Sequence, residues 1–445
     1  MTANVSEYRI NVLTKGRKVI LTDMNSDKLD RKHYSFTILI ALIVLKIGAG
    51  AAAACTANFI APVVKEFGCM VSQFTLMTSI MAVSMSLLYT TAANTLNRFR
   101  IGRVMGIAAL FQTIGIAMLA TYHSIGWFYV SGVIIGSSQA FTGLVATPIV
   151  VNMWFKKKTG TVLGIVIAVQ QISSVCFGLL TGQLITSFGW RIAYVVLAVV
   201  MGITVPFLFI LMKSPEEVGC EPFGAGEVVA QDLKAGNNNK WGLTLKEALR
   251  KPAFWIAWLT CLMYSYGTGG FTHFASYSTL ELGESTNFGA WAGMCMSLGG
   301  IVCSLLLGRI NDRFGVKAGL IWGAFFCAAG FSIAIISKNS HYLIFAGAFV
   351  TGLAYSMYTV QCPLIARSVV GDRNYSGIWA VMMVANSLIG GGLSFTIGLF
   401  YDKTGTYRGA FIMCIGMFIA ALITGSIAVN MAKQYKDEKR ISLQE

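Results

Sequence analysis

The chain contains twelve apolar runs, and this repetition constrains the fold more than any other feature of the sequence. Most runs reach the roughly 20 residues that an α-helix needs to cross a bilayer. A soluble domain could not cover so much apolar surface, since 55% of the residues are hydrophobic and only 12% are charged. The sequence predicts an all-α polytopic membrane protein with transmembrane helices at 36–62, 70–93, 103–121, 127–151, 160–186, 190–212, 253–280, 287–308, 318–337, 341–366, 376–400 and 408–431.

Positive charge is concentrated in alternate segments between these runs. The chain has 34 Lys and Arg and a formal net charge of +15. If the N-terminus is cytoplasmic, the external segments hold only Lys65, Arg191, Lys338, Lys403 and Arg408. This bias follows the positive-inside rule, so we expect cytoplasmic N- and C-termini in a plasma or inner membrane. The basic residues would then lie in short segments at the surface of the lipid bilayer, so no nucleic-acid partner is expected.

The longest polar gap divides the runs six and six. Residues 213–252 are polar and glycine-rich, and LTLKEALRK within them is typical of a short surface helix. We expect a cytoplasmic N-terminal segment (1–34), an N-terminal six-helix bundle (35–212), a cytoplasmic linker (213–252), a C-terminal six-helix bundle (253–431) and a cytoplasmic tail (432–445). Residues 1–34 lack the pattern of a cleavable signal, so the first run should remain as a membrane helix.

The two groups of runs repeat a short loop sequence. Asn97-Arg98-Phe99 follows the second run and Asp312-Arg313-Phe314 follows the eighth, at the same place in each group. This repeat indicates two pseudo-symmetric six-helix bundles. The second loop resembles the G-x-x-x-D-R-x-G-[RK] pattern of the major facilitator superfamily, with Gly308, Asp312, Arg313, Gly315 and Lys317. The first loop departs from it, with Ala93 for the glycine and Asn97 for the aspartate.

The resemblance implies a function for these loops. In the superfamily they hold the cytoplasmic side closed, which implies a conformational lock made by Asn97, Arg98, Gly308, Asp312 and Arg313. The alternative is that these arginines only set the topology. The stretches WFKKKTGTVLG (154–164), FGWRIAYVVLAVV (188–200) and PEEVGCEPFG (215–224) further resemble the oxalate/formate antiporter and monocarboxylate porter branch. The cations of that branch do not transfer, since their positions fall near Asn58 and at Met382 or Met383.

Lys46 is the one charged residue in the interior of a run; Arg103, Arg191 and Arg408 lie at the ends of theirs. A lysine near the bilayer centre costs about 2.5–3.5 kcal/mol on insertion scales, so it needs a reason. None of the 19 Asp and Glu lies inside a predicted helix to pair with it. Gly50, Ala53 and Ala57 share its helix face, which leaves room for a ligand or for a neighbouring helix. An anionic ligand would neutralise Lys46; the alternatives are a lysine that snorkels to the headgroups and a helix-packing seam.

Other polar side chains gather on particular runs. In the resembling superfamily the third, sixth, ninth and twelfth helices face lipid and the others surround a cavity. Each of these residues could instead make an ordinary hydrogen bond or aromatic contact between helices. With Lys46, the residues that we predict to bind substrate are Gln139, Gln170, Gln171, Tyr266, His273, Tyr277, Tyr355, Tyr358, Gln361, Trp379 and Asn386.

An enzymatic function finds no support in the sequence. There is no P-loop, no G-x-S-x-G motif and no metal-spaced His/Cys cluster, so we expect no catalytic residues, metal or cofactor. The sequence favours a monomeric secondary active transporter of a small organic anion, a monocarboxylate, working by alternating access as an exchanger or a proton-coupled symporter. Protons or a counter-anion are the expected coupling partners. The alternatives are transport of a neutral or zwitterionic solute such as an amino acid or a sugar, and a transporter-like receptor that signals through residues 213–252.

Overall fold

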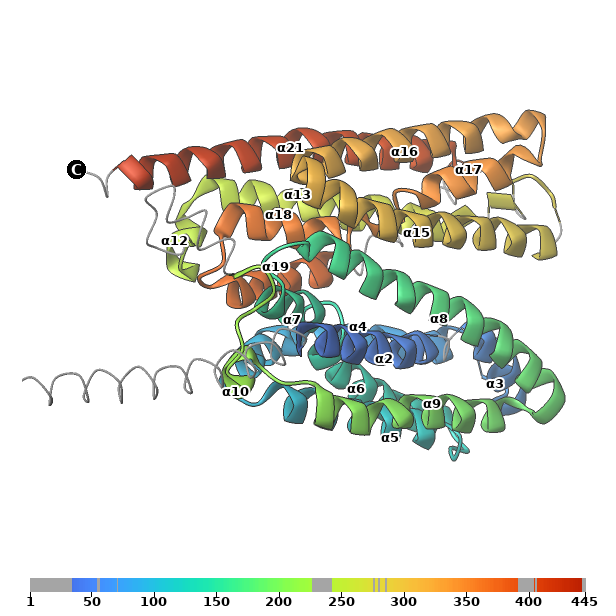
Figure 1. Ribbon diagram of the computed structural model, residues 1–445. Helices are drawn as coiled ribbons and strands as arrows, with labels where there is room; N and C mark the ends of the chain where they lie inside the picture. Colours follow the sequence, from blue (N-terminus) through green and yellow to red (C-terminus); the bar gives the residue numbers. More distant parts are fainter. Residues whose placement is uncertain are drawn as a thin grey trace, which may run out of the picture.

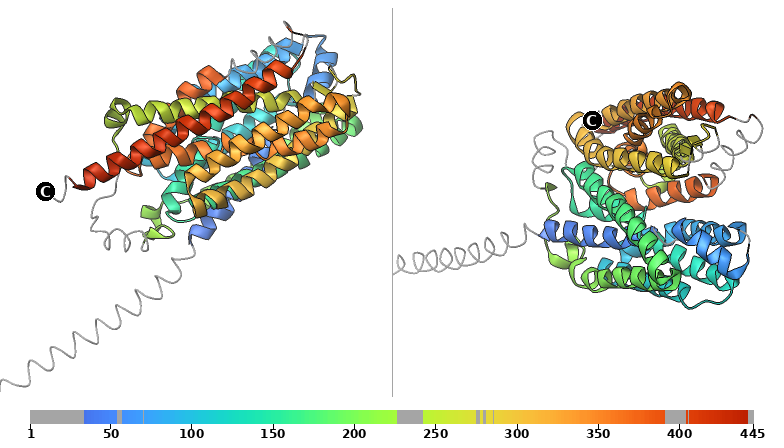
Figure 2. Two further views of the ribbon diagram at one scale, coloured as in Figure 1. Left: turned by 90° about the horizontal axis from the view of Figure 1, so that it is seen from above. Right: turned by 90° about the vertical axis from the view of Figure 1, so that its right-hand side faces the viewer.

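The computed structural model describes residues 34–53, 57–69, 71–225, 242–274, 277–278, 281–284, 286–390, 404 and 406–441. Within these residues the chain is helical, with two isolated β-bridges and no strand. The helices form two halves that lie side by side (Figure 1). Seen from the right-hand side, the yellow to red helices of the second half lie above the blue and green helices of the first, and the two groups touch (Figure 2, right).

The first half is built from eight helical segments. They are α2 (Tyr34–Ala53), α3 (Ile60–Phe67), α4 (Val71–Arg98), α5 (Ile101–Leu119), α6 (Ile125–Thr142), α7 (Ala146–Trp154), α8 (Thr159–Phe188) and α9 (Trp190–Leu211), with the 3-10 turn η1 (Ala57–Phe59) before α3. Within this half α4 packs on α6, α5 on α9, and α2 on both α8 and α9.

The second half repeats this arrangement. Its segments are α13 (Pro252–Gly269), η2 (Gly270–His273), α15 (Thr286–Phe314), α16 (Val316–Ile336), η3 (Ser337–Asn339), α17 (Leu343–Gly352), η4 (Tyr355–Met357), α18 (Gln361–Val370), α19 (Tyr375–Gly390) and α21 (Arg408–Ile441). Here α13 packs on α21, and α16 packs on α17 and α21.

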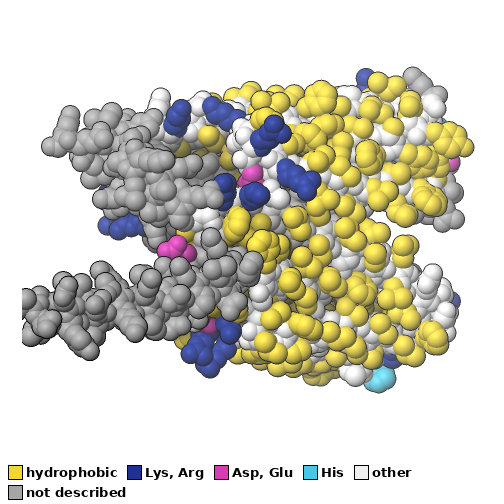
Figure 3. Space-filling model, in the orientation of Figure 1, with side chains coloured by type: hydrophobic (Ala, Val, Ile, Leu, Met, Phe, Trp, Pro, Cys, Tyr) yellow, Lys and Arg dark blue, Asp and Glu magenta, His cyan; other side chains and the backbone are white. Residues whose placement is uncertain are grey.

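The membrane prediction agrees with these helices. By length and composition, ten helices among the described residues could cross a membrane. At the other two predicted positions the structure has α13 and α19, and residues 391–403 beyond α19 lie outside the described part. Exposed apolar side chains cover the outside of both halves (Figure 3). The protein is therefore an all-α polytopic membrane protein with two halves.

The fourth predicted helix of each half is broken at the same place in the repeat. Residues 127–151 were expected to be continuous, but α6 ends at Thr142 and α7 begins at Ala146. Residues 341–366 are likewise divided between α17, η4 and α18, and α18 begins at Gln361, which is the repeat equivalent of Ala146. Apolar periodicity does not encode such a break, because both pieces remain apolar. The shared position supports an internal duplication.

The segment between the halves is fastened at both of its described ends. Short helix α10 (Pro215–Val218) is capped by Ser214, and after it Phe223 N donates to Trp154 O at 2.8 Å. At the other end, Leu243 N donates to Val370 O at 2.8 Å before α12 (Leu245–Arg250) begins with a Thr244–Glu247 capping box. The short helix predicted from LTLKEALRK is confirmed by α12.

Candidate functional site

The two halves meet along two helix pairs, α8 with α15 and α4 with α19. The contact between α8 and α15 is made by backbone atoms, because glycines replace side chains on both helices. A Cβ on Gly308 would lie 2.1 Å from the Gly160 carbonyl oxygen, and one on Gly164 would lie 2.1 Å from the Ser304 carbonyl oxygen. Any larger residue at these positions would push the helices apart, so this seam depends on glycine.

Polar contacts between the halves are strongest at one end of this seam. We call it the basic end, because it carries Arg98, Arg100, Arg103, Lys156, Lys157, Lys158, Arg309, Arg313 and Lys317, and the opposite end the far end. The Asp312 carboxylate, at the end of α15, accepts hydrogen bonds from Gly160 N at 2.9 Å and from Thr161 N and Oγ1 at 2.6 Å each. It thus caps the first turn of α8 in the other half.

Three further contacts close the basic end, and the longest is the ion pair of Lys156 Nζ with Asp372 Oδ2 at 4.0 Å. Asn97 Nδ2 donates to Ser376 Oγ at the start of α19, and in the internal repeat this contact corresponds to that of Asp312 with α8. Arg367 holds Asp372 within its own half, with 2.9 Å between Nε and Oδ1, and donates from Nη1 to Thr159 Oγ1 across the seam at 2.6 Å.

The predicted lock residues take different parts in this closure. Asn97, Gly308 and Asp312 contact the opposite half directly. The guanidinium groups of Arg98 and Arg313 lie 5.8 and 5.2 Å from the rings of the phenylalanines that follow them. Among the described residues no salt bridge joins either arginine to the other half.

The far end has no such contacts among the described residues. Glu66 accepts from Trp190 and Arg191 of its own half, and the Trp190 hydrogen bond, followed by that from Arg191, holds the pKa of the Glu66 carboxyl below its usual value. Glu281 accepts from Tyr407 N at 2.7 Å and pairs with Lys338, also within one half. Figure 3 shows a notch between the halves at this end, on the right of the view. The described part of the molecule is closed at the basic end and open at the far end.

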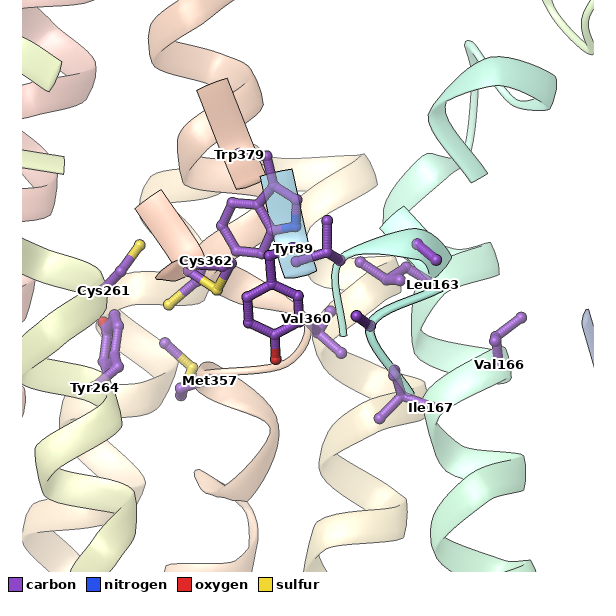
Figure 4. Packing of buried hydrophobic residues seen from close by; sticks show 14 of the residues in the cluster. Tyr89, Leu163, Val166, Ile167, Cys261, Tyr264, Met357, Val360, Cys362 and Trp379 are labelled. Carbon is purple, nitrogen blue, oxygen red and sulfur yellow. The ribbon is translucent and has the colours of Figure 1, made fainter. Parts of the chain in front are cut away.

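Between the two ends lies an apolar layer with a few polar atoms. Tyr89 of α4 and Trp379 of α19 lie close together there, with Leu163 and Ile167 of α8 nearby (Figure 4). All four side chains are buried. Within the described part of the chain, no hydrogen-bond partner reaches the buried Trp379 Nε1 or Asn386 Oδ1, and the buried Tyr89 hydroxyl has only Ser387 beside it. Buried polar atoms are normally satisfied, so this layer has spare hydrogen-bonding capacity.

Two of the predicted substrate-binding residues, Tyr358 and Asn386, are hydrogen-bonded to each other in this layer. Asn386 Nδ2 donates to the Tyr358 hydroxyl at 2.8 Å. Tyr89 contributes from the opposite half, with its hydroxyl beside Ser387 and its ring near Tyr358. The sequence prediction missed Tyr89, whose run contains only Gln73 as another long polar side chain, more than four turns away.

Gln171 is a predicted substrate-binding residue whose side chain joins the two halves. Its Nε2 donates to Ser304 Oγ at 3.0 Å and to Ser356 Oγ at 3.3 Å, both in the second half. Gly300 and Tyr355 complete its surroundings, since a Cβ on Gly300 would touch both the Gln171 amide and the Tyr355 ring. Ser304 and Ser356 were not predicted, because serine is common in membrane helices and carries little signal alone.

Lys46 lies in the middle of α2 and is 2% exposed. Among the described residues, no hydrogen bond or ion pair reaches its ammonium. The small residues on its face have a packing role: a Cβ on Gly50 would lie 2.5 Å from Ser173 Cβ of α8, and Ser173 Oγ donates to Ile47 O at 2.7 Å. Gly50 therefore belongs to a helix seam, and Ala57 lies beyond the end of α2, in η1. Gln170 lies beside this seam, with its backbone oxygen against Gly50.

Three of the predicted residues use their polar atoms within the second half. Gln361 is fully buried, accepts from Asn311 Nδ2 and donates to Val316 O, both at 2.7 Å. The Tyr277 hydroxyl donates to Ala334 O at 3.0 Å, and that of Tyr266 to Met413 Sδ at 3.3 Å. These side chains tie helices together in the structure as it stands.

The remaining predicted residues make fewer polar contacts. His273 has a buried Nε2 without a hydrogen-bond partner in the structure, and its ring lies 5.7 Å from that of Tyr407. Gln139, near the end of α6, is half-buried. Tyr266, His273 and Tyr277 were expected to share a face of one helix, but α13 ends at Gly269 and the face is interrupted by η2.

Comparison with known proteins identifies the architecture. The family model described as Major Facilitator Superfamily matches residues 42–289 and 274–442, which together cover most of the chain. The chain belongs to the major facilitator superfamily. It is therefore a transporter rather than an enzyme, and a secondary active one that works by alternating access.

Individual members of the superfamily resemble the chain only distantly. A protein of Arabidopsis thaliana named "Putative glycerol-3-phosphate transporter 1" is 23% identical over 373 residues, covering 76% of this chain and 69% of that protein. The proton:xylose symporter XylE, bound to 6-bromo-6-deoxy-D-glucose, superposes with a TM-score of 0.73 at 13% identity, covering 90% of this chain and 96% of XylE. The transporter FucP in the outward conformation gives a TM-score of 0.66 at 13% identity, covering 89% and 99%. These structures establish the fold and leave the substrate open.

Proposed function

We propose that this superfamily member transports a small organic anion carrying one negative charge, a monocarboxylate, and that Lys46 is its charge contact. The carrying observation is that Lys46 is buried in α2 with no acidic partner among the described residues. No Asp or Glu occurs anywhere between Glu66 and Glu216, so the first half has no carboxylate in α4 to α9 to neutralise it. A buried cation without a partner is costly, and a bound anion would remove that cost.

The rest of the proposed site comes from the layer between the halves. Tyr358 and Asn386, with Trp379 beside them, would hold the uncharged part of the substrate through hydrogen bonds that are incomplete in the structure. The hydrogen bonds of Gln171 to Ser304 and Ser356 would exist only while α8 and α15 are in contact, because they must break when the two helices separate. In the proposed topology both termini are cytoplasmic, so the structure faces outward.

The similarity to the oxalate/formate antiporter and monocarboxylate porter branch supports this substrate class through residues 154–164, 188–200 and 215–224. A second candidate is a small organic phosphate, which the name of the Arabidopsis relative favours. Both candidates are anions, so Lys46 has the same part in each.

The test is binding and uptake by the purified protein. Thermal-shift measurements against formate, lactate, oxalate, glycerol 3-phosphate and xylose should show stabilisation by monoanions first, since a single lysine pairs best with a single charge. Competition of proteoliposome uptake should give the same order. Preferential binding of oxalate or of xylose would contradict the proposal, and preference for glycerol 3-phosphate would favour the second candidate.

Lys46 variants test the contact itself. Lys46→Gln should keep the fold, because a neutral amide is cheaper in the membrane than a charge, and should weaken anion binding by about 1.5–3 kcal/mol, or roughly 10- to 150-fold. Lys46→Arg should retain part of the activity. Normal binding by a well-expressed Lys46→Gln protein would assign Lys46 a structural role.

A further inference from the structure

An apolar pocket lies on the outside of the first half, away from the α8–α15 seam. It has a volume of about 450 Å³ and is formed by α4, α5 and α6. Its walls are almost entirely apolar, and Ile107, Phe111 and Val133 on its rim are 48%, 54% and 47% exposed. These side chains face the surroundings of the protein at the level of the transmembrane helices, so the pocket opens toward the lipid.

The shape and the lining of the pocket suit a hydrocarbon chain. Along α5 it extends from Val104 to Phe111, which is about 10 Å parallel to the helix axis. Two of its hydroxyl groups are already used within their own helices: Thr95 Oγ1 donates to Thr91 O at 2.7 Å, and Ser138 Oγ to Ile134 O at 2.8 Å. The lining therefore offers little to a polar ligand and much to an apolar one.

One end of the pocket is bordered by positive charge. Arg98 lies one turn beyond Thr95 at the end of α4, and Arg103 lies next to Val104 and one turn before Ile107 on α5. Both arginines are exposed, and no salt bridge to either occurs in the described part of the chain. Because no Asp or Glu occurs between Glu66 and Glu216, the nearby helices supply no counter-charge.

We propose that this pocket binds an anionic phospholipid, with one acyl chain between α4, α5 and α6 and the phosphate at Arg98 and Arg103. The basic end of a membrane helix pair lies at the depth of the headgroups, where arginines attract lipid phosphate. An acyl chain alone would make the site indifferent to the headgroup. The two arginines make it selective for a negative one.

The experiment compares two lipids with identical chains on the purified full-length protein. Phosphatidylglycerol should raise the melting temperature more than phosphatidylcholine does, and native mass spectrometry should show it retained. Each arginine near a membrane surface contributes roughly five-fold to the binding of an anionic lipid, so Arg98→Gln with Arg103→Gln should weaken phosphatidylglycerol binding roughly thirty-fold. Free glycerol 3-phosphate should give no stabilisation that depends on these two arginines, because it has no chain to occupy the pocket.

Two further variants separate the parts of the site. Arg313→Gln is the matched control, since Arg313 is the repeat equivalent of Arg98 and also lies over a phenylalanine, and it should leave lipid binding unchanged. Ser137→Phe should fill the pocket and abolish retention of the lipid while both arginines remain. Equal stabilisation by the two lipids, or unchanged phosphatidylglycerol binding by the double arginine variant, would overturn the proposal. So would a dimer in native mass spectra that Ser137→Phe dissociates, because the pocket would then receive a second copy of the chain.

Discussion

Asp312 should control how often the basic end opens. Its carboxylate accepts hydrogen bonds across the seam from two backbone N–H groups and one hydroxyl of α8. Asp312→Asn keeps the shape but removes the charge, and the amide can accept at only one of its two terminal atoms. Losing a charged helix cap costs about 0.5–2 kcal/mol, and Asp312 is exposed, so we expect about 1 kcal/mol, or roughly a five-fold larger open population.

A buried reporter can measure this change. Leu163 is 1% exposed in the apolar layer, so Leu163→Cys should react with a maleimide only when the basic end opens. Reaction should be roughly five-fold faster with Asp312→Asn, and initial uptake should fall, because the outward-open state is less populated. The parent protein without Leu163→Cys corrects for its native cysteines.

The repeat supplies the matched controls. Asn97→Asp would place a carboxylate at the start of α19, beside Ser376, where Asp312 meets α8 in the other copy. It should slow labelling and affect uptake less than Asp312→Asn does. Arg313→Gln removes a neighbouring charge that makes no contact across the seam and should change neither rate. Equal labelling rates for Asp312→Asn and Asn97→Asp would refute the reasoning.

Three other perturbations have defined outcomes. Tyr89→Phe removes a buried hydroxyl that lies beside Ser387 and makes no close hydrogen bond among the described residues, so the melting temperature should change little while substrate affinity falls; unchanged affinity would place Tyr89 outside the site. Gly160→Ala would put a Cβ 2.7 Å from a backbone oxygen of α15 and should abolish transport, whereas Gly178→Ala in the same helix, with open space around it, should not; equal uptake would contradict the tight seam. The Trp190 hydrogen bond lowers the pKa of Glu66, so the stability that it contributes is present above the unfolded value near 4.3 and is lost as pH falls through the folded pKa. Glu66→Gln should therefore lower the melting temperature at pH 7, and the difference from the wild type should shrink as the pH falls below about 4.3; a constant difference would contradict this.

The fold was accessible from the sequence because membrane helices are encoded by length and apolarity. Every predicted span has a helix at its position, and the superfamily was identified from the Asp312-Arg313 loop. The positions at which the helices break could not be predicted from apolar periodicity. The residues around Gly143 stay apolar on both sides of the break. The Gly-Thr-Gly-Gly stretch at the end of α13 lies inside a predicted membrane run, and glycine is also common in unbroken membrane helices.

The candidate site was predictable only within single helices. The face of Trp379, Met383 and Asn386 lies in an unbroken α19, and Tyr358 adds a neighbour to it. The face that joined Tyr266 to Tyr277 required a helix that ends at Gly269. Contacts between the halves, such as Gln171 with Ser304, depend on which helices meet, and one sequence without the three-dimensional arrangement does not contain that information.

The repeat is symmetric in position and asymmetric in charge. Asp312 and Arg367, both in the second half, reach the first turn of α8, whereas the equivalent positions in the first half are Asn97 and Asn152. An amide forms weaker hydrogen bonds than a carboxylate or a guanidinium group. The α8–α15 side of the basic end is thus held by charge and the α4–α19 side by neutral contacts. Opening should therefore begin at α4 and α19, where Asn97 and Ser376 separate at the lower cost, and α8 should leave Asp312 last.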